Sequence, residues 1–189
     1  MKWLQKYHAD LLNGEGLREV IFLSGCKHQC EGCFNKESWD FNQGKKWKNQ
    51  DTEELINELK KPYIKGVTFT GGDPLYNYEK LIMILEILDW IKDRNNLSFD
   101  IWVYTGFTFE SIIQNKQYCE ILDYIDVLCD GPFIKSLHKN NPKKWVGSSN
   151  QRVIDVKRSL KEGRVIEIEN LYKDERKNKV VPQLSCGLS

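Results

Sequence analysis

The sequence lacks a hydrophobic run long enough to cross a membrane. Its most apolar stretch, LIMILEILDWI at 81–91, is short and contains Glu86 and Asp89, whereas a membrane-spanning helix needs about 20 apolar residues. The first residues, MKWLQKYHADLLNGEG, also lack the apolar core of a signal peptide. We therefore expect a cytoplasmic protein without a membrane segment.

An excess of charge of one sign is also absent. The chain has 28 Lys and Arg residues against 27 Asp and Glu residues. Proteins that hold a nucleic-acid backbone need clustered positive charge, because binding is driven by the release of counterions. The balance argues against nucleic acid as a partner. Proline is scarce, with five residues in 189, and hydrophobic residues make up 40%, which is typical of one globular domain.

Cysteine is limited to six residues, and their arrangement does not suit a disulfide framework. Such frameworks occur in small secreted domains, whereas this chain is long and has no export signal. Three cysteines are clustered in GCKHQCEGCFN at 25–35: Cys26, Cys30 and Cys33. The isolated cysteines are Cys119, Cys129 and Cys186. We interpret Cys119 and Cys129 as small buried apolar side chains.

Apolar runs typical of strands alternate with stretches typical of helices. The predicted strands are 19–25, 67–72, 98–106, 124–133 and 151–157, and the predicted helices are 51–61, 77–96 and 108–124. This alternation indicates parallel strands joined by right-handed crossovers. The expected fold is α/β, either a partial (β/α) barrel or a curved, mostly parallel sheet of about five to six strands. We expect residues 1–157 to form this domain and 158–189 to be a charged C-terminal extension.

Most of the predicted strands end in a polar or glycine-rich segment, namely SGC, TGGDP, YTGF or DGPF. The carboxyl ends of parallel strands meet at one edge of the sheet, where such folds build their active sites. The cysteine loop is therefore expected beside Gly71, Gly72 and Asp73. Asp73 also has a simpler interpretation, as a turn residue or helix cap before Pro74, and the same alternative applies to Asp130 in DGPF.

Three thiolates this close together indicate zinc, copper(I) or an iron–sulfur cluster. A closed zinc site takes four ligands, usually as two separated pairs, and a cubane cluster normally takes four cysteines. Three cysteines leave one iron with an open position, where an external ligand can bind. We favour the cluster. The alternative is a zinc site completed by His8, His28 or one isolated cysteine.

A CxxxCxxC loop after one predicted strand and GGDPL after the next resemble the radical S-adenosylmethionine (SAM) superfamily. The resemblance implies a 4Fe-4S cluster on Cys26, Cys30 and Cys33, with the open iron binding the methionine part of SAM. It also implies that Gly71, Gly72 and Asp73 contact that part of SAM. Glycine suits such a segment because a side chain would intrude.

Four longer stretches resemble one family, the activating proteins of anaerobic (class III) ribonucleoside-triphosphate reductase. They are NGEGLREVIFLSGCKHQCEGCFNKESWDFNQG, TFTGGDPL, DVLCDGPF and GSSNQRVIDV, in the same order. The resemblance implies reductive cleavage of SAM and formation of a glycyl radical on the large subunit of the reductase. It also implies flavodoxin or ferredoxin as electron donor.

Further residue assignments follow from the resemblance. An aromatic residue commonly precedes the third cysteine near the adenine of SAM, but here Gly32 does, and Phe34 on the other side of Cys33 offers an apolar surface instead. Asp130 is predicted to orient the amino group of SAM or the incoming glycine loop. His28, inside the cysteine loop, is predicted to tune the cluster by hydrogen bonding to sulfur. Asn150, Gln151 and Arg152 receive no chemical role from their spacing.

Two other functions stay open. A small-molecule radical SAM enzyme of the deazapurine-synthase type would share the cysteine and glycine motifs, but should lack DGPF and GSSNQR. A zinc-stabilised binding module would have no catalysis and would hold one colourless metal ion. Trp39 and Trp47 are interpreted as core or surface anchors rather than docking residues.

Overall fold

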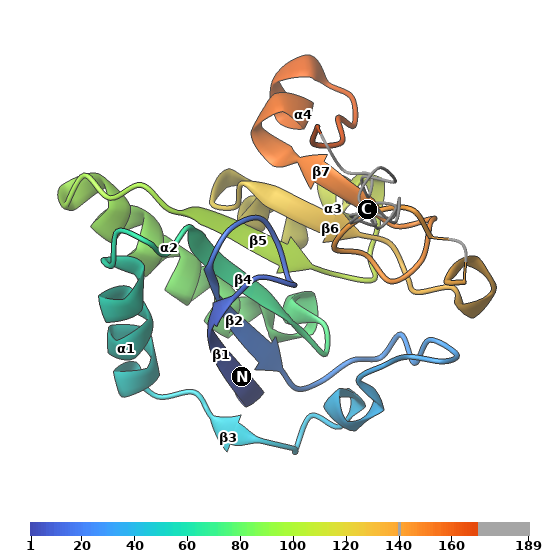
Figure 1. Cartoon of the computed structure of the whole chain (residues 1–189), viewed down its shortest axis with the longest axis horizontal. Helices are drawn as coiled ribbons and strands as arrows, with labels where there is room; N and C mark the ends of the chain where they lie inside the picture. The colour runs from blue at the N-terminus through green and yellow to red at the C-terminus, as the bar shows by residue number, and fades with distance from the viewer. Residues whose placement is uncertain (140, 170–189) are drawn as a thin grey trace, which may run out of the picture.

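A seven-stranded sheet forms the centre of the computed structural model, which describes residues 1–139 and 141–169 (Figure 1). The strands are β1 (Lys2–Asp10), β2 (Arg18–Leu23), β3 (Lys45–Lys46), β4 (Gly66–Gly71), β5 (Asp100–Tyr104), β6 (Val127–Asp130) and β7 (Arg152–Asp155). The α-helices are α1 (Asn49–Leu59), α2 (Tyr78–Arg94), α3 (Phe109–Gln114) and α4 (Val156–Glu162). Short 3-10 helices span Lys36–Trp39, Pro74–Asn77, Tyr118–Asp123 and Lys135–Leu137.

Four parallel strands occupy the middle of the sheet, whose order is β3-β1-β2-β4-β5-β6-β7. β2 pairs with β4, β4 with β5, and β5 with β6, all in parallel. Helices lie between them in sequence, α1 before β4, α2 before β5 and α3 before β6. The predicted α/β class is therefore confirmed, and the carboxyl ends of these four strands share one edge.

The flanking strands differ from the prediction. β7 is antiparallel to β6, because the connection between them contains only the short helix Lys135–Leu137 and no crossover that could return the chain in parallel. β1 and β3 were not predicted. β1 is antiparallel to β2 and most of its side chains are partly exposed, so its sequence, KWLQKYHAD, lacks the apolar run of a buried strand. The described sheet therefore has seven strands rather than five or six.

The main core lies between the helices and one face of the sheet. Alternation along β5 directs Ile101 and Val103 into this core, where they join apolar side chains of α1, α2 and α3. The opposite face carries Trp102 and, on β6, Cys129. Cys129 is fully buried, as predicted, whereas Cys119 is partly exposed, so that prediction was wrong.

A buried arginine ties three parallel strands together on this second face. Arg18 is fully buried and donates hydrogen bonds to the Thr68 hydroxyl at 2.9 Å and to the Asp100 carboxylate at 2.5 Å. Its guanidinium also lies 4.9 Å from the ring centroid of Trp102. The Arg18–Asp100 ion pair places a charged side chain in the interior. Removing either residue would leave the other charge unpaired, which would destabilise the fold.

The boundary expected at residue 157 falls inside α4. Gly163, with φ of 66°, ends this helix, and the chain then returns along β7, where Ile168 N donates to Val153 O at 2.9 Å. Ile166 is buried, so the chain up to residue 169 packs on the sheet. Residues 170–189, with Cys186, lie outside the described residues. Within the described part of the chain, none of the helices has the length and apolar character needed to span a membrane.

Candidate active site at the cysteine loop

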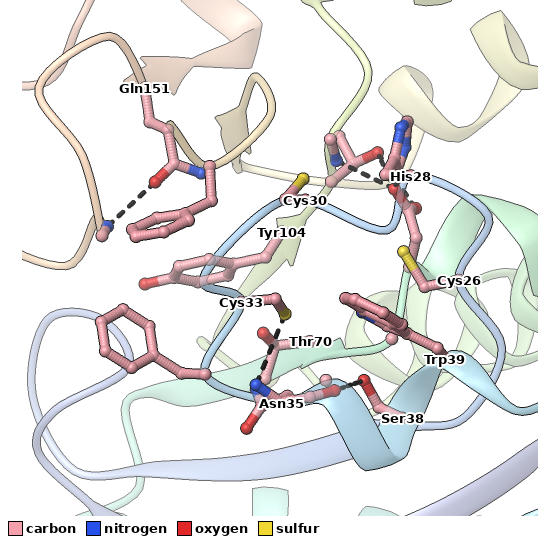
Figure 2. A pocket seen from close by; sticks show the side chains of 18 of the residues that line it. Cys26, His28, Cys30, Cys33, Asn35, Ser38, Trp39, Thr70, Tyr104 and Gln151 are labelled. Atoms are coloured by element: carbon pink, nitrogen blue, oxygen red, sulfur yellow. Dashed lines mark hydrogen bonds and ion pairs between the residues drawn. The ribbon is translucent and has the colours of Figure 1, made fainter. Parts of the chain in front are cut away.

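One cavity lies at the edge where the parallel strands end, and segments from four strand ends line it (Figure 2). The cysteine loop follows β2, and residues 70–73, 104–106 and 131–133 follow or end β4, β5 and β6. Gly147 and Gln151, which precede β7, complete the wall. The prediction that the polar segments meet at one edge is confirmed.

The three clustered cysteines all line this cavity and are partly buried. Figure 2 shows their side chains around the same space. Among the described residues, only His8, Glu19 and Glu58 bring three possible ligand atoms within 4.8 Å of one another, so the three sulfur atoms are more widely spread. A tetrahedral zinc site with Zn–S bonds of about 2.3 Å needs sulfur atoms about 4 Å apart. The wider spacing suits a larger cluster.

Of the residues weighed as a fourth zinc ligand, His28 lines the cavity, His8, Cys119 and Cys129 do not, and Cys186 lies outside the described residues. His8 pairs with Glu19 near the amino end of β2, at the opposite edge of the sheet. The Nε2 atom of His28 lies 2.9 Å from the Asp73 carboxylate. Cys129 is fully buried in the second apolar cluster. Among the described residues, three thiols and no fourth line the cavity, a set that suits a 4Fe-4S cluster with one open iron better than a closed site of four thiolates on zinc.

Backbone hydrogen bonds fold the cysteine loop onto the segment that follows it. Gly25 N donates to Ser38 O at 2.7 Å, and Cys26 N donates to Trp39 O at 3.2 Å. Burial raises the pKa of the Cys26 thiol. The thiolate that a metal ligand requires is thus disfavoured until a positive centre binds beside it.

Gly71 and Gly72 line the cavity, and the structure gives a reason for glycine at both positions. Gly71 has φ of 99°, and a Cβ there would lie 2.6 Å from Leu23 N. A Cβ on Gly72 would lie 2.6 Å from Gly25 O. Gly72 N also donates to Leu23 O at 2.7 Å. Close packing of the end of β4 against β2 and the cysteine loop therefore requires glycine, in addition to any space a ligand needs.

Asp73 is a buried junction of hydrogen bonds. Its carboxylate accepts from Leu75 N, the Thr105 hydroxyl and Gly106 N, each at 2.9 Å. The fourth partner is His28, also at 2.9 Å. Asp73 therefore caps the helix that follows it and links the cysteine loop to the end of β5. These contacts support its interpretation as a helix cap.

His28 packs tightly into this junction. Its ring centroid lies 4.7 Å from that of Phe107 and 5.4 Å from that of Tyr76. A Cβ on Gly106 would lie 2.5 Å from the imidazole. Because Asp73 engages Nε2, this nitrogen is not available to a sulfur atom. The Nε2 contact anchors the loop to Asp73, and tuning of the cluster by His28 stays a prediction.

Asp130 does not line the cavity. The buried carboxylate accepts from Phe109 N at 2.7 Å and from Arg152 Nε at 2.9 Å. Arg152 also binds Glu110 through two hydrogen bonds of 2.9 and 2.8 Å, which lower the pKa of Glu110 to about 2. The contact of Asp130 with SAM or a glycine loop stays a prediction, and the geometry favours an indirect role.

The NQR segment, which received no role from the sequence, holds the loop after β6. Asn150 Nδ2 donates to Pro132 O at 2.8 Å, and Gln151 Nε2 donates to Gly131 O at 2.9 Å. Gln151 Oε1 accepts from Gly147 N at 2.9 Å. DGPF and GSSNQR thus form one unit, and Gln151 is a cavity residue that the sequence analysis missed. Trp39, interpreted from the sequence as a core or surface anchor, also lines the cavity, as does Tyr104 of the predicted YTGF segment.

The residues beside Cys33 lie at the mouth of the cavity. The Phe34 side chain is 69% exposed, and its ring centroid lies 5.3 Å from that of Phe133. Gly32 has φ of 77° and faces the Lys135 side chain, and it is not among the lining residues. Phe34 is therefore better placed than Gly32 to meet a ligand. Trp47, in contrast, is a core anchor, as predicted.

Comparisons with known proteins agree with this geometry. A family model described as a 4Fe-4S single cluster domain matches residues 12–154. The anaerobic ribonucleoside-triphosphate reductase-activating protein of Enterobacteria phage T4 is 42% identical over 155 residues, which cover 81% of this chain and 93% of that protein. The proteins of the same name from Haemophilus influenzae and Escherichia coli K12 are 41% and 37% identical over 155 residues each.

These two relatives are matched over 96% and 97% of their own length, and the matches cover 80% and 81% of this chain. The matched family region contains the cysteine loop, the GGD segment and the DGPF and GSSNQR unit. On the strength of these matches, the chain belongs to the family of anaerobic ribonucleoside-triphosphate reductase-activating proteins.

Proposed function

We propose that this chain is a radical SAM activase that generates a glycyl radical on the large subunit of an anaerobic ribonucleoside-triphosphate reductase. The observation that carries the proposal is a set of three thiols facing a cavity at the carboxyl edge of parallel strands, with no fourth thiol from residues 1–139 or 141–169 in its lining. The names of the relatives support the reductase as partner. When bound, the cluster supplies the electron that cleaves SAM into methionine and a 5′-deoxyadenosyl radical.

Different residues of the cavity bind different parts of the cluster and of SAM. Cys26, Cys30 and Cys33 hold three irons of the cluster and leave the fourth for SAM. The backbone of Gly71 and Gly72 lies where the methionine part of SAM can be contacted, and Asp73 holds the adjoining loop ends in place. Phe34 supplies apolar surface near the adenine. The protein positions the reacting groups and excludes competing hydrogen donors.

The open sheet suits a protein substrate. Its outer strands are β3 and β7, so the described strands do not close into a complete barrel, and we assign the fold to the partial-barrel type of the radical SAM superfamily. Phe34 is 69% exposed, and its ring contacts those of Phe133 and His138. Ile134 and Leu137, the chain neighbours of these two residues, are 40% and 39% exposed. We assign this apolar rim, Phe34, Ile134 and Leu137, to the glycine loop of the reductase, and a flavodoxin or ferredoxin to electron supply.

The decisive experiment combines the anaerobically reconstituted protein with SAM, a reductant and the reductase large subunit. We expect a cluster signal that changes when SAM is added and a glycyl doublet in the electron paramagnetic resonance (EPR) spectrum. Cys33→Ser should abolish both signals. Cys129→Ala should abolish neither, because Cys129 is buried away from the cavity.

The other outcomes identify the alternatives. SAM cleavage without a glycyl doublet would favour a small-molecule radical SAM enzyme. A colourless protein that binds one zinc ion and cannot be reconstituted with iron and sulfide would favour the zinc module.

A further inference from the structure

A second group of ligand-type side chains lies at the far end of the sheet from the cysteine loop. His8 on β1, Glu19 on β2 and Glu58 on α1 bring one ligand atom each within 4.8 Å of one another. Glu19 is the second residue of β2, and the cysteine loop follows the carboxyl end of that strand. At about 3.3 Å per residue, the group is too distant to share a ligand with the cavity.

Glu19 is the unusual member of the group. Its side chain is only 5% exposed. The Oε2 atom lies 2.6 Å from His8 Nδ1, but the buried Oε1 atom has no hydrogen-bond partner. A buried carboxylate oxygen without a partner is costly, because it loses its hydration and gains nothing in return. The sheet therefore holds an acceptor that lacks its donor or cation.

The space beside Glu19 can hold one small particle. A cavity of about 10 Å³ is lined by Glu19 and Glu58, together with Lys6, Ile21 and residues of α1, and His8 lies next to it through its contact with Glu19. That volume is close to the minimum for a single water-sized occupant. Figure 1 shows α1 beside β1 and β2, so an occupant here would join three elements. His8, whose side chain is 53% exposed, connects the group to solvent.

The charges around the cavity do not balance. Lys6 pairs with Asp51 at 2.6 Å and with Glu54 at 2.7 Å, and Lys61 pairs with Glu58 at 2.5 Å. This group thus has four carboxylates, those of Glu19, Asp51, Glu54 and Glu58, against two ammonium groups, which leaves two negative charges. A protonated His8 would neutralise one of them. A divalent cation would neutralise both.

We propose that His8, Glu19 and Glu58 bind a divalent first-row metal ion of the Mn²⁺ or Zn²⁺ kind. One imidazole nitrogen and two carboxylates, without sulfur, are the donors that such ions accept. Ligand atoms of one metal ion with bonds of about 2.1 Å lie about 3 Å apart, so the His8 to Glu19 separation of 2.6 Å requires only a small adjustment. The ion would crosslink β1, β2 and α1.

The test uses the cluster-loaded protein under anaerobic conditions, so that the clustered thiols are occupied. Mn²⁺ is the probe, because it prefers oxygen and nitrogen ligands to thiolates and its free form is measured directly by EPR. We expect one Mn²⁺ bound per chain, displaced by added Zn²⁺. Glu19→Gln keeps the shape of the side chain but should weaken Mn²⁺ binding at least tenfold, and His8→Gln should do the same.

Glu54→Gln is the matched control. It removes one negative charge from the same helix but no proposed ligand, so we expect a change of less than threefold. If Glu54→Gln and Glu19→Gln weakened Mn²⁺ binding equally, the effect would come from the loss of negative charge and not from the loss of a ligand. That result would overturn the proposal. Absence of stoichiometric Mn²⁺ and Zn²⁺ binding would also overturn it, and would leave the group as a buried ion pair. If Glu19→Gln fails to fold, the exposed His8→Gln variant still decides the question.

Discussion

Replacement of Asp73 by asparagine tests whether this side chain is a structural junction or a direct contact of SAM. Asparagine keeps one oxygen, which can still accept from Leu75 N and the Thr105 hydroxyl. Its amide group then faces Gly106 N, a donor that cannot change its role. His28 can adapt by presenting the other tautomer. The substitution therefore leaves the Gly106 N–H group without an acceptor. The remaining hydrogen bonds are made to a neutral side chain instead of a charged one.

The expected loss follows from these contacts. A hydrogen bond to a charged acceptor contributes about 1.5 to 3 kcal/mol, and the stranded Gly106 N–H bond is of this kind. We expect Asp73→Asn to lower the free energy of unfolding by about 2 to 3 kcal/mol. With a slope of about 2 kcal/mol per molar urea, the midpoint should fall by roughly 1 M.

The assay is urea denaturation of the cluster-free protein under anaerobic conditions, followed by tryptophan fluorescence. Thr105→Val is the comparison variant, because it removes one donor to Asp73 and the acceptor of Phe107 N but leaves the carboxylate in place. We expect a loss of about 1 to 2 kcal/mol. An unchanged midpoint for Asp73→Asn, together with weaker SAM binding by the cluster-loaded variant, would refute the structural reading and make Asp73 a direct contact.

Three more predictions concern other parts of the molecule. Arg18→Met should lower the free energy of unfolding by about 3 kcal/mol, because it leaves Asp100 unpaired, and Asp100→Leu in the same chain should restore part of that loss in urea denaturation. Arg152 lowers the pKa of Glu110 to about 2 from 4.5, so this pair stabilises the fold above about pH 4.5 and its contribution disappears as the pH falls toward 2. The difference in unfolding free energy between the wild type and Glu110→Gln should shrink over that range. A constant difference would contradict the prediction. Leu137→Ser, at the apolar rim, should raise the concentration of reductase needed for half-maximal glycyl radical formation severalfold and leave SAM cleavage unchanged; equal effects on both would mean that the rim does not dock the reductase.

Local sequence patterns predicted the central part of the fold. The strands β2, β4, β5 and β6 are short apolar runs that end in glycine or polar residues, and each is buried on both faces. The helices α1 and α2 also lie within the stretches predicted as helices, 51–61 and 77–96, to within a few residues. These patterns are local, since burial on both faces selects apolar residues and the helix period selects one apolar stripe. β1, which lies between β3 and β2, escaped prediction because its side chains are mostly partly exposed, so it has no such pattern.

The sequence predicted which strand-end segments meet at the cavity but not how they connect. The cysteine spacing, GGD and DGPF each mark a strand end, and parallel pairing brings such ends together. The sequence could not show that Asp73 would bind His28 and Gly106, or that Asn150 and Gln151 would hold the loop after β6. These contacts join residues from different loops, and their partners depend on how the loops fold against one another.

Residue types and spacing were thus sufficient for the α/β class, for the family resemblance and for the three candidate cluster ligands, because thiolate chemistry and strand patterning act over a few neighbouring residues. The direction of β7, the burial of the Asp130 carboxylate against Arg152 and the grouping of His8, Glu19 and Glu58 were decided only when the chain packed. Each of these depends on groups that are far apart in the sequence, and the energy of a buried charge or hydrogen bond is set by the neighbours that folding brings to it.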